Sequence, residues 1–335
     1  MLVPRGKLQS VLRTKFRTTA HLLNVMLLLT ACGTSLDNTG WREFTAGREY
    51  QLATSLRGDN KEDEARRIFA NLRRLEPSNI AALYHEALLT KESTTRASFK
   101  EELLGLIDAS DNEKLHASYR AALSLIEDDR PTKEQLLNEA LTIDSDNCLA
   151  HALLSLSLEE RGEFELAYQH NLDAAKGLTP PPRVFRKLAS YEASKGRRDK
   201  AIKYYETYLV FEPEDSVALY NLGTLYLESA SWSDAEKHLS TAFELDGQDL
   251  DIILNYAKAS IENGRYVVAM ELLDRAERLN PNDPDIYYNR GVFQAERLSE
   301  FSNAIDSFEL YLKYKGPEIR RVRGWIEELK SRLEE

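Results

Sequence analysis

Side chains that could carry out acid–base, nucleophilic or metal chemistry are scattered through this sequence of 335 residues rather than grouped. The two cysteines are not paired at metal-ligand spacing, and no glycine-rich phosphate loop is present. We therefore predict that the chain is not an enzyme and holds no metal and no cofactor. Its histidines beyond the first forty residues are then surface or core residues: His85, His116, His151, His170 and His238.

The charge balance excludes one class of partner. The chain has a net charge of -11 at pH 7, whereas nucleic-acid binding needs a basic face that neutralises phosphates. The composition is 42% hydrophobic and 30% charged with only 15 glycines, which fits a helical chain with few loops. We therefore expect no nucleic-acid partner.

The first 31 residues differ in kind from the rest. They contain five basic residues and no acidic residue, and the apolar run Leu22–Leu29 follows the basic region. This order is typical of a secretory signal, and the apolar run is too short to span a bilayer comfortably. The run ends in Leu29, Thr30, Ala31 and Cys32. These four residues resemble the bacterial lipobox, in which the chain is cut before a cysteine that carries acyl groups.

The lipobox resemblance implies a signal peptide of residues 1–31, a lipidated Cys32 and a polar tether over residues 32–45. Gly33 rather than Asp follows the cysteine, which in lipoproteins of this kind favours passage to the outer membrane. The chain would then be anchored at the periplasmic face of the bacterial outer membrane. The alternative is a buried cysteine in an N-terminal amphipathic helix. With Cys32 acylated, Cys148 has no disulfide partner, and we interpret it as a small packed residue.

One stretch, Ser216–Asp249, has the pattern of two consecutive helices packed together. Small and apolar residues share one face of each helix: Leu222, Gly223 and Tyr226 in the first, and Ala235, Leu239 and Ala242 in the second. Two helices approach closely only where little side chain stands between them, so Gly223 and Ala235 mark the predicted crossing. The Ala235 column recurs at steps of 34 residues, at Ala65, Ala167, Ala201 and Ala269.

This pattern resembles the tetratricopeptide repeat family. The resemblance implies an all-α, right-handed superhelical solenoid of eight helix–turn–helix repeats over residues 46–316. The register slips by one residue after Asp283, so that Ala304 and Phe308 take the next core positions. A capping helix is predicted over residues 317–335, with an apolar stripe of Ile319, Val322, Ile326, Leu329 and Leu333.

Repeats two and three depart from the pattern. The crossing column holds Phe99 in one and Lys133 in the other, where a bulky side chain is expected to push the helices apart. The segment Glu92–Ser98 is rich in Ser and Thr and predicts a lengthened turn. These repeats are either functional or degenerate.

In the tetratricopeptide family, the first helices of the repeats line a concave groove. Carrying the ligand-facing positions onto this sequence predicts a groove for a protein or peptide partner, lined by Tyr84, Arg183, Arg186, Lys187, Ser190, Tyr220, Asn221, Thr224, Asn255, Lys258, Tyr288 and Asn289. The asparagines could hold an extended peptide backbone, although Asn is common at that position in the family. The basic residues from Arg183 to Lys187 could meet an acidic segment, or form salt bridges to a neighbouring repeat.

The lipobox and the repeats together resemble the lipoproteins that assist assembly of type IV and tight-adherence pili. The resemblance implies a membrane-anchored scaffold that binds other envelope proteins and assists assembly of a pilus or secretion complex. The alternative is an adaptor that recruits cell-wall hydrolases or proteases. No feature of the sequence selects between the two or sets an oligomeric state.

Overall fold

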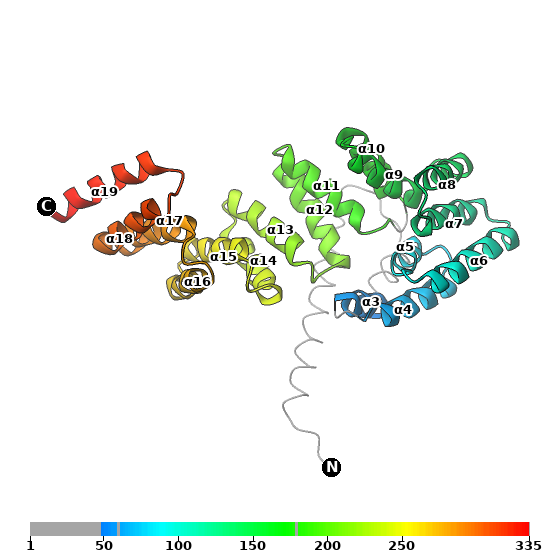
Figure 1. Ribbon diagram of the computed structural model, residues 1–335, viewed down its shortest axis with the longest axis horizontal. Coiled ribbons are helices and arrows are strands. Elements are labelled where there is room, and N and C mark those ends of the chain that lie inside the picture. Colours follow the sequence, from blue (N-terminus) through cyan, green and yellow to red (C-terminus); the bar gives the residue numbers. More distant parts are fainter. Residues whose placement is uncertain (1–47, 59–60, 178–179, 335) are drawn as a thin grey trace, which may run out of the picture. The chain divides into compact units, whose positions relative to one another are not determined.

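The computed structural model describes residues 48–58, 61–177 and 180–334, so the predicted signal (1–31), Cys32 and the tether lie outside the described residues. Within these ranges every regular element is a helix. The helices follow one another as consecutive antiparallel hairpins (Figure 1). The predicted all-α array of helix pairs is confirmed.

The described chain divides into two compact units between Pro181 and Pro182. In the N-terminal unit the described helices are α3 (Arg48–Gly58), α4 (Glu62–Leu75), α5 (Ile80–Leu88), α6 (Ser93–Ala109), α7 (Glu113–Ile126), α8 (Arg130–Ile143), α9 (Cys148–Glu160) and α10 (Phe164–Ala175). In the C-terminal unit they are α11 (Arg183–Ser194), α12 (Arg198–Phe211), α13 (Ser216–Glu228), α14 (Trp232–Leu245), α15 (Leu250–Glu262), α16 (Tyr266–Leu279), α17 (Pro284–Phe293), the π-helical turn η1 (Gln294–Leu298), α18 (Phe301–Lys313) and α19 (Ile319–Glu334).

Glycines in the first helices allow the paired helices to cross closely. A Cβ added to Gly223 of α13 would stand 2.5 Å from Cγ of Leu239 on α14. Gly291 of α17 meets Phe308 of α18 in the same way, with an added Cβ 2.6 Å from Cε1 of the ring. Leu239, Phe308 and Ala235 are all buried. The predicted crossing is confirmed, and the side chain that fills the notch at Gly223 is Leu239.

Asparagine and aspartate side chains start most of the first helices. Each accepts a hydrogen bond from a backbone N–H in the first turn of the helix that it precedes, which satisfies a donor that the helix itself leaves unpaired. The residues are Asn79, Asn112, Asn147, Asp215, Asp249 and Asp283. Asn147, for example, accepts from the backbone N–H of Ala150 and caps α9.

The turn between the two helices of a repeat needs a left-handed residue. Gly162, Gly196 and Gly264 occupy it with φ of 76°, 71° and 73°. At the equivalent position of the α13–α14 turn stands Ala230, with φ of 56°. A Cβ disfavours this conformation, so Ala230 costs the fold free energy that the glycines do not.

The one-residue slip of the register is absorbed by a π-helical turn. Residues 294–298 continue α17 with the wider hydrogen-bond spacing of a π-helix, and Ser299 then adopts a left-handed φ of 57°. A single extra residue in a helix is usually accommodated in this way. Ala304 and Phe308 consequently reach the buried positions that the slipped register predicts.

Repeat two is built differently from the others. The predicted lengthened turn over Glu92–Ser98 is wrong, because α6 begins at Ser93 and runs for 17 residues, whereas α5 has only nine. Among the described helices, α5 packs on α4 and α7, and α6 packs on α7, without the close pairing of first and second helix seen in the other repeats. Phe99 is buried in this core, so the predicted separation of the two helices is confirmed here.

A buried ion cluster holds α6 in place of a close helix crossing. Arg73 of α4 donates to the carboxylate of Glu86 on α5 and, over 2.7 Å, to Glu102 on α6. Arg73 and Glu86 are almost fully buried, and burial raises the pKa of Glu86 while the hydrogen bond from Arg73 opposes that rise. Losing either partner would leave an unpaired buried charge, so the cluster links three helices.

Repeat three does not show the expected separation. Lys133 is half-buried, yet α7 and α8 pack closely, with Leu137 and Ala140 in the core. A lysine has a flexible aliphatic stem that can lie along an apolar surface with its charge in water. The prediction from Lys133 is therefore wrong, because its shape differs from that of Phe99.

The last helix, α19, packs on α18 and closes the C-terminal unit. It begins at Ile319, two residues after Pro317. Val322, Ile326 and Leu329 are buried, whereas Ile319 and Leu333 at the two ends of the predicted stripe are exposed. The capping role is confirmed with a shorter buried stripe than the sequence predicts.

His85 is a core residue of the N-terminal unit. Its ring stacks on Phe69 with centroids 4.8 Å apart, and Arg57 lies 2.9 Å from its Nδ1, where it donates to the neutral ring. Burial, helped by the positive charge of Arg57, lowers the pKa of His85 well below its usual value.

Replacing Ala230 by Gly should raise the free energy of unfolding by about 1 kcal/mol, because Gly adopts the left-handed turn without strain. The matched change Gly264→Ala should lower it by a similar amount. Urea unfolding followed by circular dichroism measures both. Equal effects of the same sign would show that turn conformation does not control stability at these positions.

Acid should destabilise the fold through His85. The folded state keeps the ring neutral, while the unfolded chain takes up a proton near pH 6.5, so the stabilisation is complete above that pH and is lost as the pH falls below it. The loss from one such group is at most about 1.4 kcal/mol per pH unit. Urea unfolding at pH 7.5 and 5.5 should show a smaller pH effect for His85→Gln than for the natural chain. An unchanged pH effect would show that His85 protonates freely in the fold.

Candidate ligand-binding face of the first helices

Most of the predicted groove residues lie on the first helices of the C-terminal unit. We call their shared surface on α11, α13, α15 and α17 the first-helix face. Helices α13 and α15 pack against each other, as do α15 and α17, so equivalent positions of successive repeats are neighbours (Figure 1). Two polar columns can therefore be followed from one junction to the next: the sixth position of each repeat holds Asn221, Asn255 and Asn289, and the ninth holds Ser190, Thr224 and Lys258.

At the first junction a pair of hydroxyls lies beside the asparagine of the next repeat. Ser190 Oγ of α11 lies 3.0 Å from the hydroxyl of Tyr205 on α12. Tyr205 is buried, and this burial raises the pKa of its hydroxyl, while the nearby side chain of Asn221 on α13 opposes that rise. Asn221 therefore meets a polar group of the preceding repeat.

The second junction repeats this arrangement. Asn255 Nδ2 donates to Thr224 Oγ1 over 3.0 Å, and Thr224 in turn donates to the backbone oxygen of Tyr220 over 2.9 Å. Partial burial raises the pKa of Tyr220, and the nearby side chain of Asn255 opposes that rise. The asparagine here acts first as a link between α13 and α15.

The third junction is open. Within the described part of the chain, the side chains of Lys258 and Asn289 have no hydrogen-bond or ion-pair partner, although Asn289 is half-buried. Tyr288 beside it packs its ring on Tyr311 and Trp325, with centroids 5.5 and 5.8 Å apart. The residue at the ninth position here is Lys258 instead of Ser or Thr, which breaks the pattern of the two preceding junctions.

The basic residues of α11 are held within the chain. Arg186 lies 3.6 Å from Asp215 Oδ2 and over the ring of Tyr208, whose hydroxyl donates to the same carboxylate over 2.7 Å. Arg183 and Lys187 also interact with other residues of the chain. Of the two alternatives from the sequence, the structure favours the intrachain bridge for Arg186.

Carboxylates accompany the open junction. Asp251 and Asp285 are exposed, and each stands four residues before the asparagine of its helix, which places the two types on one helical face. Partial burial and the neighbouring carboxylates of Asp283 and Asp251 raise the pKa of Asp285. This part of the first-helix face is therefore acidic around its open amide.

Tyr84 does not belong to an accessible face. It is 7% exposed and packs in the core of the N-terminal unit, with its ring 5.1 Å from that of His85. The prediction of Tyr84 as a ligand contact is wrong, because α5 is buried on nearly every side in the irregular second repeat.

The structure brings together two histidines that the sequence shows as scattered. His151 on α9 and His170 on α10 face each other with their Nδ1 atoms 2.8 Å apart, and His151 Nε2 lies 2.9 Å from the backbone oxygen of Ser145. Their spacing of 19 residues joins two helices of one repeat, which no local motif reveals. Among the described residues no group of three or more His, Cys, Asp or Glu side chains could hold a metal ion.

Cys148 is confirmed as a packed residue. It is buried at the start of α9, and burial raises the pKa of its thiol to about 12. An added Cβ on Gly177 would stand 2.4 Å from Cys148 Cβ, so the two are in close contact. A thiol that stays protonated at neutral pH is a poor nucleophile.

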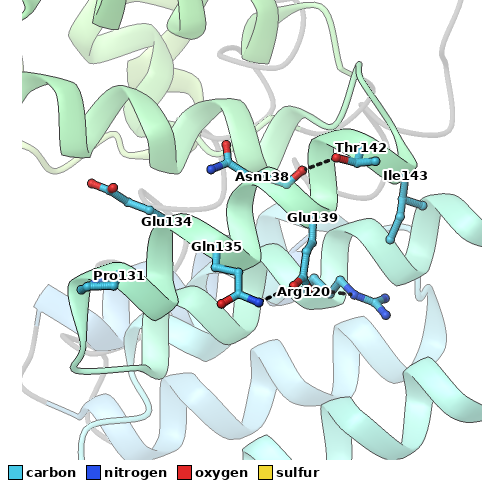
Figure 2. Close-up of a pocket in the computed structure, with 8 residues that line it drawn as sticks. All are labelled: Arg120, Pro131, Glu134, Gln135, Asn138, Glu139, Thr142 and Ile143. Atoms are coloured by element: carbon cyan, nitrogen blue, oxygen red, sulfur yellow. Dashed lines mark hydrogen bonds and ion pairs between the residues drawn. The ribbon is translucent and has the colours of Figure 1, made fainter.

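A shallow cavity of about 710 Å³ lies along α8, where no sequence motif indicates a site. Figure 2 shows that several of its polar side chains point toward one another. Gln135 donates to Glu139 over 2.8 Å, and Arg120 of α7 lies 3.7 Å from the same carboxylate. These groups pair with one another, and we assign the cavity no ligand.

None of the described helices is both long and apolar enough to cross a membrane.

Comparison with known proteins supports the repeat assignment. The sequence model described as tetratricopeptide repeat matches residues 230–288, which cover α14, α15 and α16. No curated protein sequence matches the chain.

Similar folds occur among solved structures. YrrB, described as a TPR protein with an unusual peptide-binding site, is 17% identical, with a TM-score of 0.51 over 58% of this chain and 97% of that one. MamA from Desulfovibrio magneticus RS-1 is 17% identical over 50% of this chain and 94% of its own, with a TM-score of 0.46. Yeast Tom70 is 15% identical over 82% and 60%, with a TM-score of 0.42. With the recurring helix pairs, the repeat match and the likeness to YrrB identify the fold of this chain as an array of tetratricopeptide repeats.

Proposed function

We propose that the chain is a membrane-anchored scaffold of the bacterial envelope that binds an extended segment of a partner protein on its first-helix face. The observation that carries this proposal is the open junction of Lys258, Tyr288 and Asn289. In the two preceding junctions the asparagine meets a hydroxyl group of the preceding repeat, whereas within the described residues the side chains of Asn289 and Lys258 make no hydrogen bond or ion pair. The amide of Asn289 is therefore available to pair with a bound peptide.

The chemistry of the open junction fits a peptide. An asparagine side chain both donates and accepts, so Asn289 can pair with the N–H and C=O of one extended residue. The ring of Tyr288 offers apolar area beside it, and aromatic residues commonly anchor protein interfaces. Because Asp251 and Asp285 stand next to the amides, a segment that carries Lys or Arg fits better than the acidic segment expected from Arg183 and Arg186. The peptide-binding site named for YrrB agrees with this use of the fold.

The anchor rests on the sequence before the described residues. A basic region, a short apolar run and Leu29–Cys32 stand in the order of a lipoprotein signal. Acyl chains contribute about 0.8 kcal/mol for each buried methylene, and two or more chains hold a protein stably at a bilayer. The short tether would keep the repeats close to the membrane surface. Within the envelope, we propose that the scaffold assists assembly of a pilus or secretion complex, and recruitment of cell-wall hydrolases or proteases is the competing role.

Two asparagines that share a repeat position should respond differently to replacement by alanine. Asn255→Ala removes a hydrogen bond between α13 and α15 and should lower the free energy of unfolding by about 1 kcal/mol. Asn289→Ala should leave unfolding unchanged within about 0.5 kcal/mol, because it removes no bond within the described chain. Thermal unfolding measures both, and equal losses would mean that Asn289 is also a structural link.

A photo-reactive phenylalanine analogue in place of Lys258 should cross-link a partner segment in intact cells. Adding Asn289→Ala should weaken the cross-link, while the same analogue in place of exposed Lys237 on α14 is the control that should capture nothing. Mass spectrometry of the adduct distinguishes the roles, since pilus or secretin subunits support assembly and hydrolases or proteases support the competing role. An unchanged cross-link with Asn289→Ala would contradict the binding face.

The variant Cys32→Ser should take up no labelled fatty acid and should remain as an uncut precursor. A natural chain that is itself unlabelled would contradict the anchor.

A further inference from the structure

The end of the array carries a concentrated positive charge on an acidic chain. Over residues 315–323, four cations accompany a single carboxylate, Glu318, although the whole chain has a net charge of -11. The cations are Lys315, Arg320, Arg321 and Arg323, in the turn before α19 and its first turn and a half. We call this set the C-terminal basic patch. It lies on α19 and the turn before it, whereas the first-helix face is formed by α11, α13, α15 and α17.

The patch differs from the other cations of the C-terminal unit in having few partners. Elsewhere in this unit arginines are commonly paired, as Arg198 is with Glu228 and Arg290 with Asp274 and Glu277. Within the described residues, the exposed side chains of Lys315, Arg320 and Arg323 make no ion pair or hydrogen bond. Arg321 lies over the ring of Trp325, 4.7 Å from its centroid.

The position of the arginines opposes the stability of their own helix. The N-terminus of a helix carries partial positive charge, so cations there are unfavourable by about 0.3 to 1 kcal/mol each. At the other end of α19 the arrangement is favourable, and Arg332 pairs with Glu328 over 2.6 Å. Arg320 and Arg323 therefore contribute neither a salt bridge nor a favourable helix-dipole interaction to the fold.

The surface around the arginines is accessible and partly apolar. Ile319 is 43% exposed, and an added Cβ on Gly324 would meet nothing within 4 Å. Trp325 is half-buried and packs on Tyr288 and Phe308, so its ring is held in place beneath Arg321. Arginines held beside aromatic and apolar surface are well suited to bind carboxylates, which they can grip with two hydrogen bonds.

The extent of the patch decides the kind of partner. One turn further along α19, Glu327 and Glu328 are exposed, so the positive surface is short. An extended polyanion such as a nucleic acid or an anionic membrane would meet these carboxylates as well as the arginines. A short run of Asp and Glu can contact the patch alone. We propose that the C-terminal basic patch docks a short acidic segment of a partner protein, at a surface that adjoins the first-helix face where Trp325 contacts Tyr288.

The test uses the full chain and a fluorescein-labelled peptide of six glutamates, with binding measured by fluorescence anisotropy. The natural chain should bind the peptide, and added salt should weaken the binding because the contact is between exposed charges. The double change Arg320→Glu with Arg323→Glu should weaken binding at least tenfold. The same variant should unfold at an equal or higher temperature, since acids at a helix N-terminus are favourable. Weaker binding without a lower unfolding temperature would show that the two arginines dock the peptide and are not needed for the fold.

Arg332→Glu is the matched control, because Arg332 lies on the same helix but pairs with Glu328. It should leave peptide binding within about twofold. If the Glu variant fails to fold, Arg320→Gln with Arg323→Gln tests the same contacts without reversing the charge. Absent binding to the natural chain, equal loss with Arg332→Glu, or an early unfolding of both patch variants would overturn the proposal. So would tighter, patch-dependent binding to a DNA duplex or to phosphatidylglycerol vesicles than to the peptide.

Discussion

The close approach of two helices at a small residue is the constraint on which the array depends. At Gly223 and Gly291 the first helix lies so near the second that even a methyl group would overlap Leu239 or Phe308. This proximity sets the spacing of the core residues along each helix. It also sets the repeat length, because each helix pair must pack its other side on the following pair. Where a bulky residue replaces the small one, as Phe99 does, the pair opens, and the buried ions of Arg73, Glu86 and Glu102 join the helices instead.

The same constraint explains which features the sequence predicts well. Core packing repeats, so the columns of small and large residues predict the helices, their pairing and the slip of register before Ala304. The columns of core residues do not show how the extra residue is accommodated, because a π-helical turn and a longer loop are both compatible with the spacing. The structure shows the π-helical turn at residues 294–298. In the sequence, Lys133 and Phe99 are both bulky residues in the crossing column. Their helix pairs pack differently because the lysine side chain is flexible and the phenylalanine ring is rigid.

The candidate site is predicted less well than the fold, for a physical reason. Position within a repeat indicates which side chains share a face, but hydrogen bonds between repeats depend on pairs of residues some thirty positions apart. Asn221, Asn255 and Asn289 look equivalent in sequence, yet Asn221 lies near the hydroxyl of Tyr205 and Asn255 donates to Thr224, whereas Asn289 makes no hydrogen bond within the described chain. The difference arises from Lys258, which replaces the hydroxyl that Ser190 and Thr224 provide. Tyr84 and the pair of His151 and His170 likewise depend on contacts that no single column contains.

Charged residues between the repeats and charged residues on the exposed surface have different surroundings. Inside the array, cations are placed opposite carboxylates of neighbouring helices, as Arg186 is with Asp215 and Arg265 with Glu236. Such pairs add little energy when exposed, but they cancel charge where repeats must approach each other. On α19 the exposed cations Arg320 and Arg323 find no such partner among the described residues. The carboxylates of Asp251 and Asp285 and the C-terminal basic patch then give one unit two surfaces of opposite charge. A scaffold with two such surfaces can discriminate between ligands by charge without any change in its fold.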